Sequence, residues 1–265
     1  MDSKEAAAFW ESNAETWTRH ARLGFDVYRD FLNTPAFLAM LPPVAGCKGL
    51  DIGCGEGTNT RKLAQLGAGM TAVDIAPTFI RHAQAAEDAQ PLGIRYWVAD
   101  AQELPFGDAS FDFAVAFMSI MDMAGTARVF HEVARVLRPG GFFQFSILHP
   151  CFAPPHRRVV RDAEGCTIHV ELARYFDEVE GEVEVWKFSA APEEERDKVE
   201  PFRVPRFHRT LSRWVGLILA AGFAIEAFAE PRASEESAAR FPIIEDTRHF
   251  PLTLIVRARK AAVSR

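Results

Sequence analysis

The chain has 265 residues, 48% of them hydrophobic and 25% charged, and it carries a formal net charge of −6. These proportions are typical of a globular protein with a full-sized core, and they exclude collagen, coiled coil and intrinsic disorder. Because acidic side chains outnumber basic ones, the surface as a whole repels polyphosphates, which argues against a nucleic-acid partner.

Two helices are predicted before the first strand. Residues 3–24 repeat apolar and aromatic side chains at helical spacing, among them Trp10 and Trp17. A second helix is predicted over residues 34–41, because Pro42 and the proline after it cannot continue a helix.

Five short apolar runs follow, separated by segments long enough for helical crossovers. The runs lie at residues 49–52, 70–75, 94–99, 111–117 and 141–147. The helices between them are predicted at residues 60–66, 78–86 and 127–137. This alternation predicts an α/β fold in which a mostly parallel sheet carries helices on both faces.

The rest of the chain divides into two parts. Residues 150–207 fit neither periodicity and carry ten acids and three bases between Asp177 and Glu200, so we expect an insertion of exposed loops with one short strand near residues 183–188. After it, a helix that begins at Thr210 or Ser212 and ends at Gly222 is predicted. Two strands should follow, over residues 223–230 and 251–259.

The densest motif stands where the first strand gives way to a helix and reads LDIGCGEGT from Leu50 to Thr58. Glycines at alternate positions let a ligand approach the backbone closely, and the following helix offers free N–H groups. The spacing is G-x-G-x-G. A dinucleotide fingerprint, G-x-G-x-x-G, would need its third glycine at Thr58, so the motif disfavours a nicotinamide cofactor.

Two carboxylates end the second and third apolar runs. Asp74 lies seventeen residues beyond Gly57 and can accept both hydroxyls of a ribose bound over the glycine loop. Asp100 could accept the amino group of an adenine, with the Ala101 N–H reading a ring nitrogen.

With these motifs in order, the sequence resembles the class I S-adenosylmethionine-dependent methyltransferases, in particular the small-molecule branch similar to the ubiquinone and menaquinone biosynthesis methyltransferases. The resemblance rests on Leu50–Gly57, Asp74, Asp100 with Ala101, Leu104–Asp112 and Glu132–Gly141. It implies a Rossmann-like fold with a seven-stranded, mostly parallel sheet and an antiparallel last strand. It also implies one domain, divided into an N-terminal helical lid (1–44), a cofactor-binding core (45–150), a substrate-lid insertion (151–207) and the C-terminal part of the core (208–265).

The resemblance further implies S-adenosyl-L-methionine as the cofactor and assigns residues to it. Its methionine portion would be held by Asp51, Gly53, Gly55 and Gly57, and lined by Phe117, Met118 and Ser119. Its ribose and adenine would be held by Asp74, Ile75, Asp100, Ala101 and Gln102. Trp17, with Arg29 or Thr34, would close over it as part of the lid.

Methyl transfer from such a cofactor needs mainly proximity and orientation, since the methyl group is already electrophilic. A general base helps where the nucleophile carries a proton. His149, directly after the fifth strand, is the first candidate, followed by Tyr175 and His208. A structural histidine is an equal alternative for the first, and packing within the insertion is the alternative for the other two.

The partner is expected to be a small, apolar or aromatic metabolite, because the insertion is rich in aromatic side chains that would either cover it or form their own core. The four cysteines have no metal-ligand spacing, and neither a targeting nor a membrane-spanning segment is visible, so we expect a cytoplasmic monomer or homodimer without metal. Two alternatives stay open: a non-catalytic S-adenosylmethionine-binding protein of the same fold, and a nicotinamide oxidoreductase.

Overall fold

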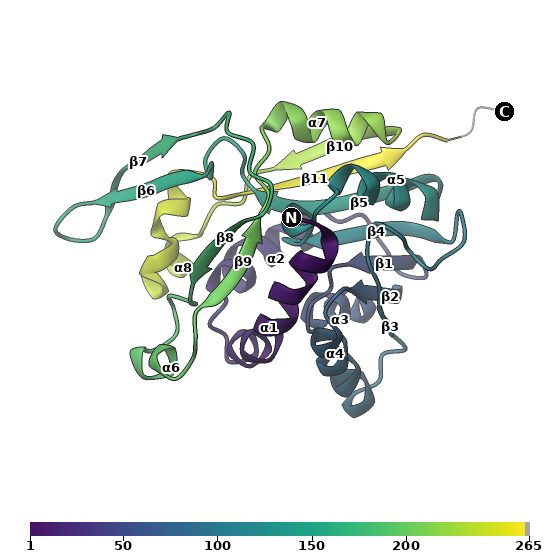
Figure 1. The fold of residues 1–265 in the computed structure, drawn as a ribbon, viewed down its shortest axis with the longest axis horizontal. Helices are drawn as coiled ribbons and strands as arrows, with labels where there is room; N and C mark the ends of the chain where they lie inside the picture. The colour runs from purple at the N-terminus through teal and green to yellow at the C-terminus, as the bar shows by residue number, and fades with distance from the viewer. Residues whose placement is uncertain (263–265) are drawn as a thin grey trace.

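A seven-stranded sheet forms the centre of the computed structural model, which describes residues 1–262 (Figure 1). Its strand order is β10-β11-β5-β4-β1-β2-β3. The strands are β1 (Lys48–Ile52), β2 (Gly69–Asp74), β3 (Arg95–Val98), β4 (Phe111–Phe117), β5 (Leu137–Leu148), β10 (Phe223–Ala229) and β11 (Thr253–Lys260). Strands β1 to β5 pair in parallel, whereas β11 runs antiparallel to both of its neighbours. The predicted fold class and its antiparallel last strand are therefore confirmed.

Helices cover both faces of this sheet because its central strands are apolar on both sides. In β4, Phe113 and Val115 pack into the apolar cluster that holds Phe37 and Leu63. Ala114 and Ala116 pack into the cluster on the other face of the sheet. The helices are α1 (Ser3–Arg22), α2 (Thr34–Met40), α3 (Thr58–Gln65), α4 (Pro77–Ala89), α5 (Thr126–Val136) and α7 (Leu211–Ala220). Figure 1 shows α5 and α7 on one side of the sheet and α3 and α4 on the other.

The N-terminal helix α1 bridges the core and the insertion. Its first turn is closed by a capping box in which Asp2 and Glu5 exchange hydrogen bonds. Midway along it, the buried Asn13 side chain donates to the carbonyl of Arg203 at 2.9 Å and accepts from the amide of the same residue at 3.2 Å. A five-residue π-helix, Arg29–Asn33, then leads into α2.

The insertion differs from the sequence-based expectation of one short strand among loops. It contains two antiparallel hairpins, β6 (His156–Arg161) with β7 (Thr167–Ala173) and β8 (Glu182–Trp186) with β9 (Phe202–Arg206), and one turn of helix, α6 (Glu193–Asp197). The strands β6 and β7 are rich in charged residues, which pair across the hairpin, as Arg158 does with Glu171. That composition concealed their strand character. Arg206 donates to the carbonyl of Ala153, so the two ends of the insertion meet at its base.

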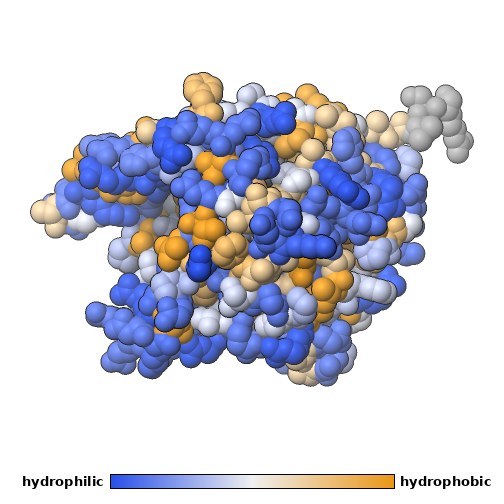
Figure 2. Space-filling view, in the orientation of Figure 1, coloured by the Kyte–Doolittle hydropathy of each residue, from blue (hydrophilic) through white to orange (hydrophobic). Residues whose placement is uncertain are grey.

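The hairpin of β6 and β7 projects from the body of the molecule, and Figure 2 shows hydrophilic and hydrophobic residues side by side on that projection. Two further elements escaped the sequence analysis, helix α8 (Glu235–Arg240) and the 3₁₀ helix η3 (Pro242–Arg248), which lie between β10 and β11. They pack on Val27 and Leu32 of the N-terminal segment. Within residues 1–262, no helix combines the length and the apolar character needed to cross a bilayer.

Candidate functional site

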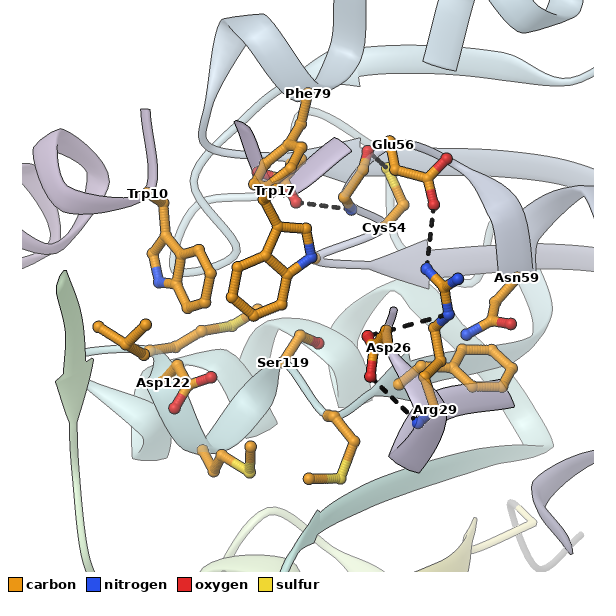
Figure 3. Close-up of a pocket in the computed structure, with 18 of the residues that line it drawn as sticks. Trp10, Trp17, Asp26, Arg29, Cys54, Glu56, Asn59, Phe79, Ser119 and Asp122 are labelled. Carbon is orange, nitrogen blue, oxygen red and sulfur yellow. Dashed lines mark hydrogen bonds and ion pairs between the residues drawn. The ribbon is translucent and has the colours of Figure 1, made fainter. Parts of the chain in front are cut away.

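A cavity of about 510 Å³ lies where the carboxyl ends of the central strands meet the N-terminal helix and the hairpin of β8 and β9 (Figure 3). Ligands of open α/β sheets bind at this edge, because the loops that follow parallel strands converge there. The cavity brings together twelve of the thirteen residues predicted to hold the cofactor: Trp17, Asp51, Gly53, Gly55, Asp74, Ile75, Asp100, Ala101, Gln102, Phe117, Met118 and Ser119. Gly57 is the exception.

The three glycines of the loop between β1 and α3 all have positive φ, but each serves a different contact. Gly55 (φ +55°) faces open space, since no described atom lies within 4 Å of where a Cβ would stand. A Cβ on Gly53 would meet the Ser119 side chain at 2.5 Å, and one on Gly57 would meet the Tyr96 hydroxyl at 2.8 Å. Gly55 therefore forms the open cradle, whereas Gly57 allows the close packing of the helix that starts beside it.

Asp51, at the end of β1, has one satisfied and one orphaned oxygen. Its Oδ2 accepts from the Thr60 hydroxyl at 2.6 Å, whereas its buried Oδ1 has no hydrogen-bond partner among the described residues. Burial raises the pKa of Asp51 to about 7. A buried acceptor without a partner is costly, so this oxygen suits the donor group of a ligand in the cavity.

Asp74, at the end of β2, is held by the backbone on both sides. Its Oδ2 accepts from the Gly55 amide and its Oδ1 from the Ala76 amide, each at 2.9 Å. Burial raises the pKa of Asp74 to about 6. A carboxylate has about four lone-pair sites, so two remain for ligand hydroxyls. Asp100 is positioned in a similar way, because its Oδ1 accepts from the Gln102 amide at 2.8 Å.

The chain after β4 completes this side of the cavity. The Ser119 hydroxyl donates to the Ile52 carbonyl at 2.6 Å, and the Met118 amide donates to the Ser146 hydroxyl at 3.0 Å. Met118 has a φ of +49°, a value that side chains other than glycine seldom adopt. These contacts fix the backbone turn that follows β4 against the glycine loop.

The N-terminal segment, residues 1–44, contributes aromatic rings and an ion-pair network. The Trp17 ring lies 4.9 to 5.3 Å from those of Trp186, Phe188 and Phe202, which belong to the insertion. Glu56, in the glycine loop, is only 5% exposed and forms ion pairs with two arginines of this segment, Arg22 at 3.4 Å and Arg29 at 3.3 Å. The N-terminal segment is therefore attached to both the glycine loop and the insertion.

The three predicted base candidates do not line the cavity. His149 has Nε2 at 2.9 Å from Glu230 Oε1, and its Nδ1 accepts from the Cys151 amide at 3.1 Å. Tyr175 accepts from the Leu211 amide at 3.1 Å through its hydroxyl. These contacts occupy both groups at the base of the insertion, away from the space a ligand could fill.

His208, the third candidate, also lies outside the cavity lining. Its Nε2 lies 2.9 Å from the carbonyl oxygen of Tyr175, and burial lowers the pKa of His208. It borders a small hollow of about 20 Å³, which Asp122 and Arg206 also line.

Ionisable residues that the sequence analysis did not select line the cavity as well. With those it did select, the described lining has seven carboxyl groups and three basic groups: Asp26, Asp51, Glu56, Asp74, Asp100, Asp122 and Glu184, against Arg29, Lys187 and Arg206. Asp122 is the only acid in the apolar stretch from Phe117 to Ala124. A lone acid among apolar residues after β4 was the sequence signal that could have marked it as a candidate. No local pattern marks Glu184 or Arg206, because they come from the insertion.

Three comparisons with known proteins bear on this site. A family profile described as Methyltransferase domain matches residues 50–145. The O-methyltransferase cnsE of Penicillium expansum is 38% identical over 117 residues, which cover 42% of each protein. The malonyl-[acyl-carrier protein] O-methyltransferase of Pseudescherichia vulneris is 32% identical over 148 residues, 56% of this chain and 55% of that protein. The matched segments thus span about half the length of these curated relatives or less.

A solved structure matches over a larger part of the chain. The crystal structure of an S-adenosylmethionine-dependent methyltransferase from Mesorhizobium loti is 30% identical, with a TM-score of 0.68. The match covers 85% of this chain and 96% of that one. The similarity therefore extends over nearly the whole fold and is not limited to the motifs of the central segment.

Proposed function

The chain belongs to the class I S-adenosylmethionine-dependent methyltransferases, and we propose that it transfers the methyl group of S-adenosyl-L-methionine to a small organic acceptor. The observation that carries the proposal is the cavity itself. It joins the glycine loop and the strand-end carboxylates to an aromatic lid in one continuous pocket that is partly open to solvent. Residues 45–150 would bind the cofactor, and residues 1–44 and 151–207 would cover the acceptor.

The residues present fit this cofactor. The orphaned Oδ1 of Asp51 suits the ammonium group of its methionine portion, and the open cradle at Gly55 gives that portion room. Asp74 would receive the ribose hydroxyls, and the segment from Asp100 to Gln102 the adenine edge. When bound, the cofactor supplies a methyl group that a positively charged sulfur makes electrophilic.

The charge of the lining supports the same choice. Seven carboxyl groups against three basic ones favour a cation over a pyrophosphate, because a cation stabilises their ionised forms whereas a further anion would raise their pKa values. S-Adenosylmethionine carries a sulfonium and an ammonium group against one carboxylate, whereas a nicotinamide dinucleotide carries a pyrophosphate. The lining therefore disfavours the oxidoreductase alternative for a reason independent of glycine spacing.

The protein's own contribution to transfer would be to orient the acceptor and to exclude water. Trp10, Trp17, Trp186 and Phe188 line the cavity from the lid and the insertion. Rings of this kind bind apolar or aromatic bodies, and they keep bulk water from the reacting atoms. We therefore assign an apolar or aromatic small molecule as the acceptor.

A calorimetric titration with S-adenosylhomocysteine tests the cofactor site. We expect micromolar binding to the wild-type protein and a loss of about a hundredfold in Asp74→Asn, because an amide cannot accept at both of its atoms. Asp88→Asn, on the solvent side of α4, is the matched control and should bind like the wild type. Equal affinity in Asp74→Asn and in the control would remove the proposed site.

Incubation of a metabolite library with S-adenosylmethionine carrying a deuterated methyl group tests the transfer. Mass spectrometry should find an acceptor that gains the labelled methyl. Binding of the cofactor without any labelled product would instead support the non-catalytic alternative.

A further inference from the structure

The acceptor side of the cavity contains one carboxyl group that the cofactor assignments leave unused. We propose that Asp122 is the catalytic base of this protein, which accepts the proton from a neutral hydroxyl group of the methyl acceptor. This inference rests on the proposed methyl transfer, and it adds that the atom that receives the methyl group is a hydroxyl oxygen.

The position of Asp122 follows from the turn after β4. It ends the short 3₁₀ helix η2 (Ile120–Asp122), and its amide donates to the Ser119 carbonyl at 3.0 Å. The helix packs against β9 of the insertion. Asp122 lies three residues past Ser119, which belongs to the side assigned to the cofactor. It thus stands where that side meets the insertion, the segment assigned to the acceptor. Figure 3 shows it on the same side of the cavity as Trp10.

The Asp122 carboxylate is free to bind a ligand. No hydrogen bond to it is formed by any described side chain or backbone group. Arg206, the cation whose charge acts on Asp122, is already engaged, because that guanidinium donates to Glu184 and to the carbonyl of Ala153. An acid retained for structural reasons would form an ion pair or hydrogen bond with such a neighbour, whereas no described group pairs with Asp122.

The electrostatic surroundings suit a base. Burial and the negative charge of Glu184 raise the pKa of Asp122 well above its usual value, and Arg206 opposes this shift. His208 lines the same small hollow as Asp122. A carboxylate whose pKa is raised binds a proton more strongly, once ionised, than an ordinary aspartate does.

The step balances with these groups alone. The acceptor oxygen forms a bond to the methyl carbon, the carbon–sulfur bond breaks with its electron pair passing to sulfur, and the hydroxyl proton passes to Asp122. The positive charge of the sulfonium and the negative charge of the carboxylate are both lost, so the products are neutral.

The same charges select against a carboxylate as the reacting group. Arg206 can neutralise only one of Asp122 and Glu184, so an anionic acceptor would meet an uncompensated negative charge. A neutral alcohol or phenol on an apolar body meets no such repulsion and offers the hydrogen bond that Asp122 lacks. The site is therefore built for a hydroxyl acceptor.

The preference for a hydroxyl over a carboxylate can be tested by binding alone, without methyl transfer. Benzyl alcohol and benzoate are suitable probes, because they share the same ring and differ in the group attached to it. With S-adenosylhomocysteine bound, at the alkaline end of the pH range in which the protein is folded, wild-type protein should bind benzyl alcohol at least about tenfold more tightly than benzoate. In Asp122→Asn the benzoate affinity should rise about tenfold while that for benzyl alcohol stays within about threefold. Asp108→Asn, an exposed acid outside the cavity, should behave like the wild type.

An unchanged ratio of the two affinities in Asp122→Asn would overturn the proposal, and so would failure of benzyl alcohol to bind at millimolar concentrations. The titration with S-adenosylhomocysteine separates this failure from that of the proposed function. If S-adenosylhomocysteine binds normally and only the probe ratio is unaffected, the cofactor site stands and the role of Asp122 falls.

Kinetics on the acceptor found by the labelling experiment test the proton transfer itself. Asp122→Asn should lower kcat by about 10² to 10⁴ with KM within about threefold, and Asp122→Glu should recover part of the loss. The acidic limb of the wild-type pH profile should disappear in Asp122→Asn. A kcat that survives this substitution, or a retained acidic limb, would contradict the assignment.

Discussion

The two halves of the cavity are built in different ways. The half that we assign to the cofactor, called here the cofactor half, takes its residues from consecutive strand ends, between Leu50 and Ser119, and fixes them by hydrogen bonds between side chains and nearby backbone. The half that we assign to the acceptor, called the acceptor half, joins α1 to β8 and β9, which lie about 160 to 200 residues away in sequence, through aromatic rings and the contact of Asn13 with Arg203. One half is determined locally, and the other only by tertiary packing.

This difference has an energetic counterpart. Hydrogen bonds to buried carboxylates are directional and hold atoms at fixed positions, as in the paired amides on Asp74. Aromatic contacts are worth roughly 0.5–1.5 kcal/mol each beyond their buried area and tolerate a range of orientations. We therefore expect the cofactor half to be rigid and the acceptor half to open first.

The largest effect should come from Trp17→Ala, which removes the ring that joins α1 to three rings of the insertion. The expected cost is about 3 kcal/mol, confined to the acceptor half. Hydrogen exchange should therefore accelerate in α1, β8 and β9 and stay unchanged in β1 and β4. Trp97→Ala, on the 47% exposed Trp97 of β3, is the control and should cost less than about 1 kcal/mol. Loss of protection throughout the sheet would show that the halves do not open separately.

Asp51→Asn should weaken S-adenosylhomocysteine binding by about a hundredfold with little effect on the lid, because it removes the charge beside the ligand's ammonium group. Thr60→Val is the matched control, since it removes the hydroxyl that donates to Asp51 but keeps the carboxylate. It should lower the free energy of unfolding by about 1–3 kcal/mol and weaken binding far less. Similar losses of affinity in both variants would mean that Asp51 acts only through local structure.

The pH dependence of stability should also distinguish the cofactor half, because two of its carboxyl groups have raised pKa values. The pKa of Asp51 is raised to about 7 from 3.8 and that of Asp74 to about 6, so each binds its proton more tightly in the folded chain than in the unfolded one. The free energy of unfolding without ligand should therefore fall as pH rises from about 4 to about 7. The ammonium group of the bound ligand favours the ionised form of Asp51, and ligand hydroxyls that donate to Asp74 favour the ionised form of that carboxylate.

Affinity for S-adenosylhomocysteine should accordingly fall by up to about tenfold per pH unit, for each carboxyl group, below about pH 6. Calorimetry between about pH 5 and 8 checks this, and Asp51→Asn should show a shallower dependence. Binding that strengthens on acidification would contradict the assigned roles of both carboxylates.

The smallest effect is expected at the hairpin of β6 and β7, outside the cavity. Arg158→Ala breaks an exposed ion pair with Glu171 and should change the free energy of unfolding by less than about 1 kcal/mol. Arg157→Ala, one residue earlier, leaves the buried Asp246 with only the longer ion pair to Arg161, at 3.7 Å, and should cost about 3 kcal/mol. Thermal melts of the two variants measure the contrast, and a costly Arg158→Ala would assign the hairpin a role in the fold.

The same division decides how much the sequence could predict. The sheet, its crossover helices, the glycine loop and the strand-end acids Asp74 and Asp100 follow from local patterns: apolar runs, glycine spacing and the place of the acids. The lining residues Phe117 to Ser119 were assigned through the family resemblance.

In the insertion only the short strand near residues 183–188 was predicted, and it corresponds to β8. The strands β6, β7 and β9 were missed, because charged residues along a hairpin conceal the alternation that marks a strand. Asp122 was passed over for a related reason. Its importance depends on Glu184 and Arg206, which only the folded chain brings near it.

The histidine at the end of β5 was left between two alternatives by the sequence, a base and a structural histidine. His149 follows a central strand, where ligand-binding residues are common, yet its ring contacts Glu230 and the backbone of its own turn, outside the cavity lining. The direction of the side chain depends on a partner 81 residues away. No periodicity contains that information.

The hydrogen bond from Arg206 to Ala153 bears on how such a protein changes its specificity. It brings the start and the end of the insertion to one point on the core, so a longer, shorter or foreign segment could replace the stretch between them with little cost in chain entropy. Exchange of that single segment would present a new surface to the acceptor and leave every strand end in place. Recombination at these two positions is thus a route, for evolution or for a protein engineer, to a new substrate with the methyl donor unchanged.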